Sequence, residues 1–167
     1  SLKTASVFFY DDPNFARAMN IDFLRKFANN VHRPSIGIYA DNSWKIDFDH
    51  PLHVNREDFG SLAKYSYLDL ANIIVHADLL MDLIKAGIKG GSLTRWTLST
   101  TCKLGEDEIR DSLDDGMEYK AKRPSFKEYH IIEVMLDGTA TRFNIFMENG
   151  KDEQFVIVSI NHCLPID

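Results

Sequence analysis

The chain has 167 residues, of which 44% are hydrophobic, and a formal net charge of −6. A chain of this length is expected to form one domain, residues 1–167, and to build a core without disulfides or structural metals. The acidic balance argues against direct nucleic-acid binding, and no apolar run reaches the length of a membrane span. The two cysteines, Cys102 and Cys163, provide no metal framework and suit a reducing, cytoplasmic location.

The N-terminal region predicts a strand followed by a helix. Residues 5–10 form a short apolar run that ends at an Asp-Asp-Pro sequence. Asp12 is expected to be the N-cap and Pro13 the first helical residue. Apolar residues then recur at four-residue spacing up to Val31, which predicts an amphipathic helix that ends near Asn30.

Alternating side chains predict a hairpin next. Residues 36–40 and 44–48 each alternate apolar with polar or small residues, and the turn sequence 41–43 (Asp-Asn-Ser) separates them. A short helix is expected to begin at Asn55.

The segment from Tyr67 to Gly87 predicts one long helix. It is apolar on most of its circumference, and Ser66 begins a sequence typical of a capping box. We therefore expect it to be the central helix, packed against the sheet and ended by glycines. Its solvent-facing stripe consists of Asp78, Asp82, Lys85 and Lys89.

The C-terminal half predicts strands around a short acidic helix. A Thr-rich strand is expected over 93–102, with Trp96, Leu98 and Cys102 on one side. The acidic helix begins near Glu106 and stops at Gly116, and residues 117–122 alternate as a further strand.

The last forty residues predict a three-stranded meander. Asp137-Gly138 and Asn149-Gly150 are typical of tight hairpin turns between apolar, β-branched runs. A two-residue turn at Asp137-Gly138 places Glu133 opposite Arg142. It also gathers six apolar residues on one face: Ile132, Val134, Leu136, Phe143, Ile145 and Met147.

Together these elements predict an α+β fold. We expect a largely antiparallel sheet of about seven strands that ends in the C-terminal β-meander. The long apolar helix and the N-terminal helix are expected to pack on one face of this sheet.

The predicted long helix aligns three polar residues that are candidates for chemistry. Asp69, Asn72 and His76 fall on one line at helical spacing, beside apolar neighbours. In a pocket between helix and sheet, His76 would act as a general base or hydrogen-bond donor, with Asn72 beside it. The alternative is structural: Asp69 caps the helix, and a core histidine bonds a backbone carbonyl.

Three further motifs lack the geometry of a site. Asp47, Asp49, His50 and His53 do not have the spacing of metal ligands on a helix or strand. Glu118-Tyr119-Lys120 resembles a nuclease metal core only faintly, because no earlier aspartate is placed with it. His162 and Cys163 are adjacent and face opposite ways on a strand. We therefore expect no metal and no cofactor.

The remaining feature is an acidic segment of seven carboxylates within 13 residues, relieved only by Arg110. Such a segment suits a basic protein partner, and the alternative is an ordinary solvated helix. Its acids are Glu106, Asp107, Glu108, Asp111, Asp114, Asp115 and Glu118.

Two functional hypotheses follow. The first is an acidic, non-enzymatic binding protein of the inhibitor, immunity or accessory type that acts through one protein–protein contact. The second is a small pocket protein, either a ligand binder or a cofactor-free enzyme. Its cavity would contain the aligned polar residues Asp69, Asn72 and His76, here called the polar ladder. The sequence favours the first because no catalytic set can be assembled from it, and it leaves the oligomeric state open.

Overall fold

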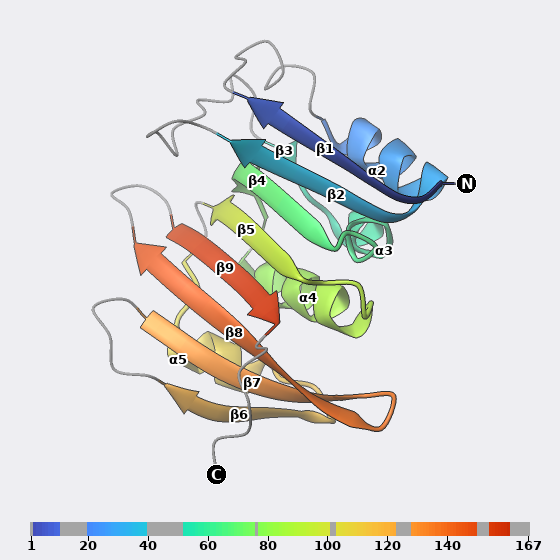
Figure 1. Cartoon of the computed structure of the whole chain (residues 1–167). Coiled ribbons are helices and arrows are strands. Elements are labelled where there is room, and N and C mark those ends of the chain that lie inside the picture. Colours follow the sequence, from blue (N-terminus) through green and yellow to red (C-terminus); the bar gives the residue numbers. More distant parts are fainter. Residues whose placement is uncertain are drawn as a thin grey trace.

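The computed structural model describes residues 2–10, 20–39, 52–75, 77–100, 103–122, 128–149 and 154–160. In these residues the chain forms an α+β fold with one mixed sheet (Figure 1). The strands are β1 (Leu2–Tyr10), β2 (Val31–Tyr39), β3 (Leu52–His53), β4 (Tyr67–Ile74), β5 (Arg95–Thr100), β6 (Met117–Lys122), β7 (Glu128–Leu136), β8 (Thr139–Asn149) and β9 (Gln154–Ile160). The helices are α2 (Ile21–Asn30), η1 (Arg56–Asp58), α3 (Phe59–Leu62), α4 (Ala77–Lys89) and α5 (Glu106–Asp111).

The sheet joins a parallel half to an antiparallel half. Its order is β1-β2-β4-β5-β9-β8-β7-β6, and β3 pairs with the C-terminal end of β4. β1, β2, β4 and β5 run parallel, whereas β5 pairs antiparallel with β9 and the meander continues antiparallel to β6. The prediction of a largely antiparallel sheet is therefore wrong. Strands joined through helices can run parallel. The order in which the strands pair depends on tertiary contacts, which local sequence patterns do not reveal.

The predicted long helix over residues 67–87 is also wrong. Its first part is the strand β4, and a separate helix, α4, begins at Ala77. β4 lies inside the sheet, between β2 and β5. Its sequence is a short apolar run, and hydrophobic periodicity alone does not distinguish such a strand from part of a buried helix. Ser66 is not a helix cap, and its hydroxyl lies 2.7 Å from that of Ser35 on the neighbouring strand.

The N-terminal helix is shorter than predicted. α2 begins at Ile21, and the Oδ1 atom of its N-cap, Asn20, accepts a hydrogen bond from the Phe23 amide at 2.9 Å. The backbone of Asn20 is extended, so no single helix runs from Pro13 to Asn30. The predicted cap at Asp12 lies outside the described residues. The predicted end at Asn30 is confirmed.

The C-terminal meander is confirmed in its strands, in the turn at Asp137-Gly138 and in the register across that turn, whereas Gly150 of the second predicted turn lies outside the described residues. Asp137 and Gly138 both have positive φ, 49° and 77°, and Leu136 pairs with Thr139 across them. Five of the six apolar residues predicted to share a face are buried in the core, and Leu136 packs against it. β5, α5 and β6 are found where the sequence predicted them, and a short helix follows Asn55 as expected. The predicted partner strand 44–48 lies outside the described residues.

The helices lie on one face of the sheet (Figure 1). The crossovers from β1 to β2 and from β4 to β5 advance in the same direction across the sheet. Because such crossovers are right-handed, they place their helices on the same side. Leu24 of α2, Ile84 of α4 and Ile109 of α5 accordingly join one core cluster with Trp96 and Val158 of the sheet.

Candidate partner interface

The acidic segment begins with a short helix that is fixed at both ends. The Gly105 amide donates a hydrogen bond to the Glu108 carboxylate at 3.1 Å, which satisfies a free donor at the helix start. At the other end the Ser112 hydroxyl donates to the carbonyls of Glu108 and Ile109, at 2.6 and 3.2 Å. The Ile109 side chain is fully buried. A six-residue helix is not stable alone, so these contacts hold α5 in place.

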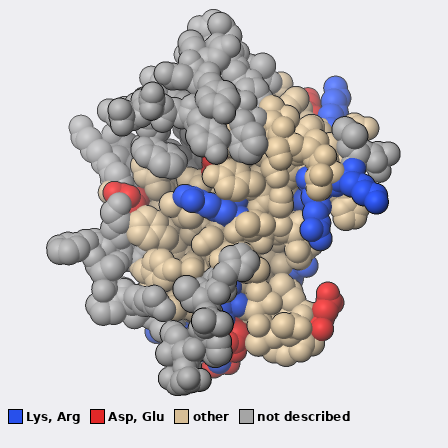
Figure 2. Space-filling model, in the orientation of Figure 1, with Lys and Arg blue, Asp and Glu red and all other residues tan. Residues whose placement is uncertain are grey.

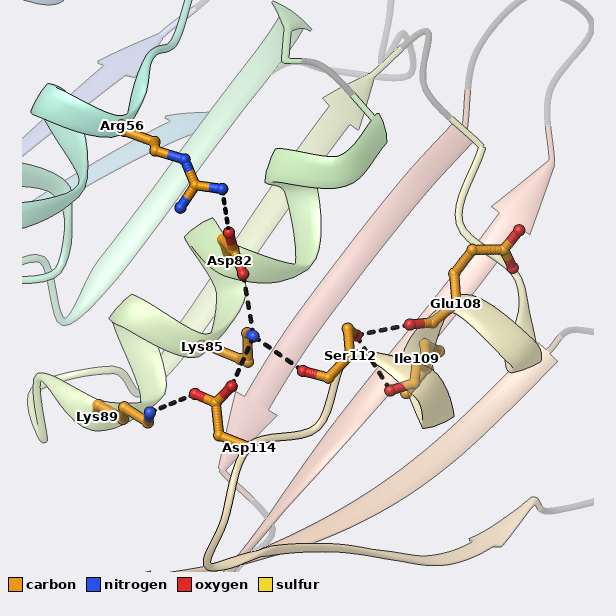
Figure 3. A network of polar contacts seen from close by, with 8 residues as sticks. All are labelled: Arg56, Asp82, Lys85, Lys89, Glu108, Ile109, Ser112 and Asp114. Carbon is orange, nitrogen blue, oxygen red and sulfur yellow. Dashed lines mark hydrogen bonds and ion pairs between the residues drawn. The ribbon is translucent and has the colours of Figure 1, made fainter.

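A polar network ties the end of this segment to α4 (Figure 3). The Lys85 ammonium group donates to the Ser112 carbonyl at 2.8 Å and to Asp114 Oδ1 at 2.9 Å. Lys89 forms a second ion pair with Asp114. Hydrogen bonds from Lys89 and Lys85 lower the pKa of the Asp114 carboxyl below its usual value. The negative charge of Asp114 is therefore balanced by two lysines of the same chain, so this carboxylate is not free to pair with a partner.

The same network changes the interpretation of the predicted solvent stripe on α4. Asp82 lies between two cations, 2.8 Å from Arg56 and 3.0 Å from Lys85. Only 12% of the Lys85 side chain is exposed. Burial lowers the pKa of Lys85, but hydrogen bonds with Asp114 and Asp82 outweigh it, and the net pKa is raised. The charges at Asp82 and Lys85 thus fasten α4 to the elements on either side of it.

Two further acids of the segment have cationic partners. Glu106 lies 2.8 Å from Arg110, whose guanidinium group also stacks 3.8 Å above the ring of Tyr119. Glu118 lies 2.7 Å from Lys120 on β6. Arg110 therefore attaches the exposed side of α5 to the sheet, because cations are attracted to an aromatic face.

Beneath this contact lies a polar pair that the sequence analysis missed. The Tyr119 hydroxyl is 2.8 Å from Nδ1 of His130, and the His130 side chain is fully buried. Desolvation is the main cause that raises the pKa of Tyr119. The alternation of side chains along β6 and β7 places Tyr119 and His130 on the core side of the sheet. No other feature of the sequence points to this pair.

Five of the seven carboxylates are exposed, and three of these five form neither an ion pair nor a helix cap among the described residues. Asp107, Asp111 and Asp115 are at the surface, and no ion pair joins them to another part of the described chain. Asp107 and Asp111 are four residues apart on α5 and therefore face the same way. Glu108 is also exposed, although it is used in the helix cap. Of the seven predicted acids, four are therefore held by contacts within the chain. The other three have no such contact among the described residues.

The second predicted site is not assembled as expected. Asp69 and Asn72 belong to β4, so their helical alignment with His76 does not exist, and His76 itself lies outside the described residues. Asp69 is opposite Thr97 of β5 in the sheet. No group of three potential metal ligands occurs within the described parts of the chain. Of the histidine and aspartate candidates near residue 50, only His53 is described, exposed on β3. His162, Cys163 and Cys102 lie outside those parts.

Comparisons of the chain with protein-family models, with curated proteins and with solved structures found no match. None of the helices in the described ranges has the length and apolar character needed to cross a membrane.

Proposed function

We propose that this protein is a non-enzymatic binding protein of the inhibitor, immunity or accessory type, and that it docks a basic protein partner through α5 and the turn after it. The contact residues would be Asp107, Asp111 and Asp115, with Glu108 at their margin. The proposal includes a cytoplasmic location, as the cysteine content suits a reducing compartment.

One observation carries the proposal: the three contact carboxylates stand on a support that other contacts make rigid. Ile109 anchors α5 in the core, Arg110 covers Tyr119, and Lys85 holds the following turn at Ser112 and Asp114. A rigid charged surface loses little conformational entropy on binding. Asp107 and Asp111 also repel each other at four-residue spacing, and a basic partner would relieve that repulsion.

The experiment compares two triple variants of the full chain. Replacement of Asp107, Asp111 and Asp115 by Asn removes three charges, whereas replacement of the same residues by Glu keeps them. Cross-linking in extracts of the native host should yield a basic protein with the wild type and the Glu variant. The Asn variant should not yield it.

Association kinetics with the purified partner provide the quantitative test. Electrostatic steering predicts an association rate that falls steeply between low and physiological salt for the wild type and the Glu variant. The Asn variant should associate at least about tenfold more slowly at low salt, with little salt dependence. A partner that binds all three proteins at one salt-independent rate would show that α5 is only a solvated surface.

The alternative of a ligand pocket is not proposed further. Its polar ladder depended on a helix over residues 67–87, and the structure has a strand in the first part of that range.

A further inference from the structure

The two outer strands of the sheet, β1 and β6, have differently built edges (Figure 1). An outer strand presents backbone N–H and C=O groups that can pair with another strand, and proteins usually protect it with charges or a bulge. β6 has both. Its pairing with β7 shifts by one residue between Tyr119 and Ala121, so that Lys120 is the extra, bulged residue. Glu118 adds a second charge beside it.

β1 has no bulge, and its one charge, Lys3, lies near the start of the strand. It is a nine-residue strand whose register with β2 continues from Leu2 to Tyr10 without a shift. Lys3 is its single charged residue, and it contains no proline or glycine. Lys3, Thr4 and Ser6 are exposed. Within the described chain, no residue outside β2 forms a backbone hydrogen bond with residues 3–7.

The surface charge also differs between the two ends of the sheet. The acidic segment lies beside β6, so two copies that met there would bring their carboxylates together. Beside β1, by contrast, the exposed charges of the described residues are Lys3, Lys26 of α2 and Arg33 of β2, with one exposed acid, Asp22 of α2, which pairs with Arg25. Figure 2 shows several Lys and Arg side chains at the right-hand side of the molecule, where β1 begins. The β1 edge is thus the one at which two acidic chains repel each other least.

We propose that β1 pairs antiparallel with β1 of a second copy, about a two-fold axis at Ser6, and so joins the two sheets into one. Ser6 is the midpoint of Leu2–Tyr10, so this axis overlaps the full strand. One isologous contact then covers both β1 edges. The two copies of Lys3 lie about 20 Å apart along the paired strands, beyond the range of strong repulsion at physiological salt.

The test is the mass of the full chain by sedimentation equilibrium over a range of concentrations. The wild type should show a reversible monomer–dimer equilibrium. Ser6→Lys places two lysines opposite each other at the axis and should give a monomer, and Ser6→Glu should do the same. An equimolar mixture of the two variants should restore the dimer, because Lys then faces Glu.

A matched control is Glu118→Gln on β6, which changes the net charge by the same amount as Ser6→Lys and should leave the dimer intact. Circular dichroism would confirm that each variant folds, and Ser6→Glu alone provides the test if Ser6→Lys does not fold. A wild type that is monomeric at every concentration contradicts the proposal. So does a dimer that survives Ser6→Lys, or a mixture that stays monomeric. The acidic segment plays no part in the β1–β1 contact. The outcome of the sedimentation experiment is therefore independent of the proposed function.

Discussion

Arg142 lies directly opposite Glu133 across β7 and β8, and its Nε atom donates a hydrogen bond to Glu133 Oε2 at 2.8 Å. The other carboxylate oxygen of Glu133 is 3.2 Å from Lys120, which also bonds Glu118. Glu118 is itself the neighbour of Glu133 across β6 and β7. Two cations therefore hold together two carboxylates that would otherwise repel each other.

This arrangement predicts an order of stability for charge variants. Arg142→Glu places a third carboxylate in the cluster and should lower the melting temperature. Adding Glu133→Arg to it should recover most of the loss, because the new arginine lies between Glu118 and the new glutamate. Thermal unfolding of the wild type, the single variant and the double variant checks this order. Equal stability of single and double variants, or a difference that does not shrink at high salt, would contradict it.

Gly87 predicts a steric effect in the core. It lies within α4, where an added Cβ atom would come within 2.8 Å of three atoms of the buried Trp96 ring. Gly87→Ala should therefore destabilise the protein by about 1–3 kcal/mol, although alanine is the better helix former. Gly60→Ala is the matched control, because nothing lies within 4 Å of its added Cβ atom. Denaturant unfolding should show Gly60→Ala at or slightly above wild-type stability, and a loss there equal to that of Gly87→Ala would exclude the steric cause.

Tyr65 predicts a loss of stability at alkaline pH. Its hydroxyl donates to the Leu24 carbonyl at 2.9 Å, and burial raises the pKa of Tyr65 well above its usual range. The unfolded chain ionises this tyrosine near pH 10, so stability that is complete below about pH 10 declines above it. Tyr65→Phe should cost about 1 kcal/mol at neutral pH.

The same substitution should make stability less sensitive to pH above about 10, because the buried hydroxyl no longer titrates. Urea unfolding of both proteins between about pH 8 and pH 11 measures the two slopes. Parallel curves throughout this range would show that Tyr65 does not contribute to the alkaline decline.

Asp114 predicts the opposite dependence on pH. Because Lys89 and Lys85 lower its pKa, its contribution to stability is present above the usual carboxyl pKa of about 4 and is lost as pH falls through the lower folded value. Asp114→Asn should cost less than about 1 kcal/mol at neutral pH, since the side chain is 36% exposed and solvent screens its ion pairs.

The difference between Asp114→Asn and the wild type should disappear in strong acid. Asp115→Asn is the control for Asp114→Asn, because this neighbouring carboxylate is exposed and has no ion pair among the described residues. It should leave stability unchanged at every pH. A loss in Asp115→Asn equal to that in Asp114→Asn would mean that general charge, and not the network, determines stability here.

The sequence by itself determined the elements whose signals are local. The meander follows from period-two alternation on a half-covered sheet and from the positive φ of Asp137 and Gly138, which a type I′ turn requires. The register that joins Glu133 to Arg142 follows from the length of that turn. The short helix α5 follows from Gly105 at its start and from the apolar residues Ile109 and Leu113, which pack in or against the core.

The tertiary structure decided what depends on contacts distant in the sequence. β4 is a strand because β2 and β5 cover its two edges, while its own apolar run suits a helix equally well. Asp114 is neutralised by lysines 25 and 29 residues away, and no spacing rule relates such positions. Local patterns fix a residue's neighbours within a turn or a hairpin, whereas long-range pairing decides which of the seven acids have an ion pair and which have none among the described residues.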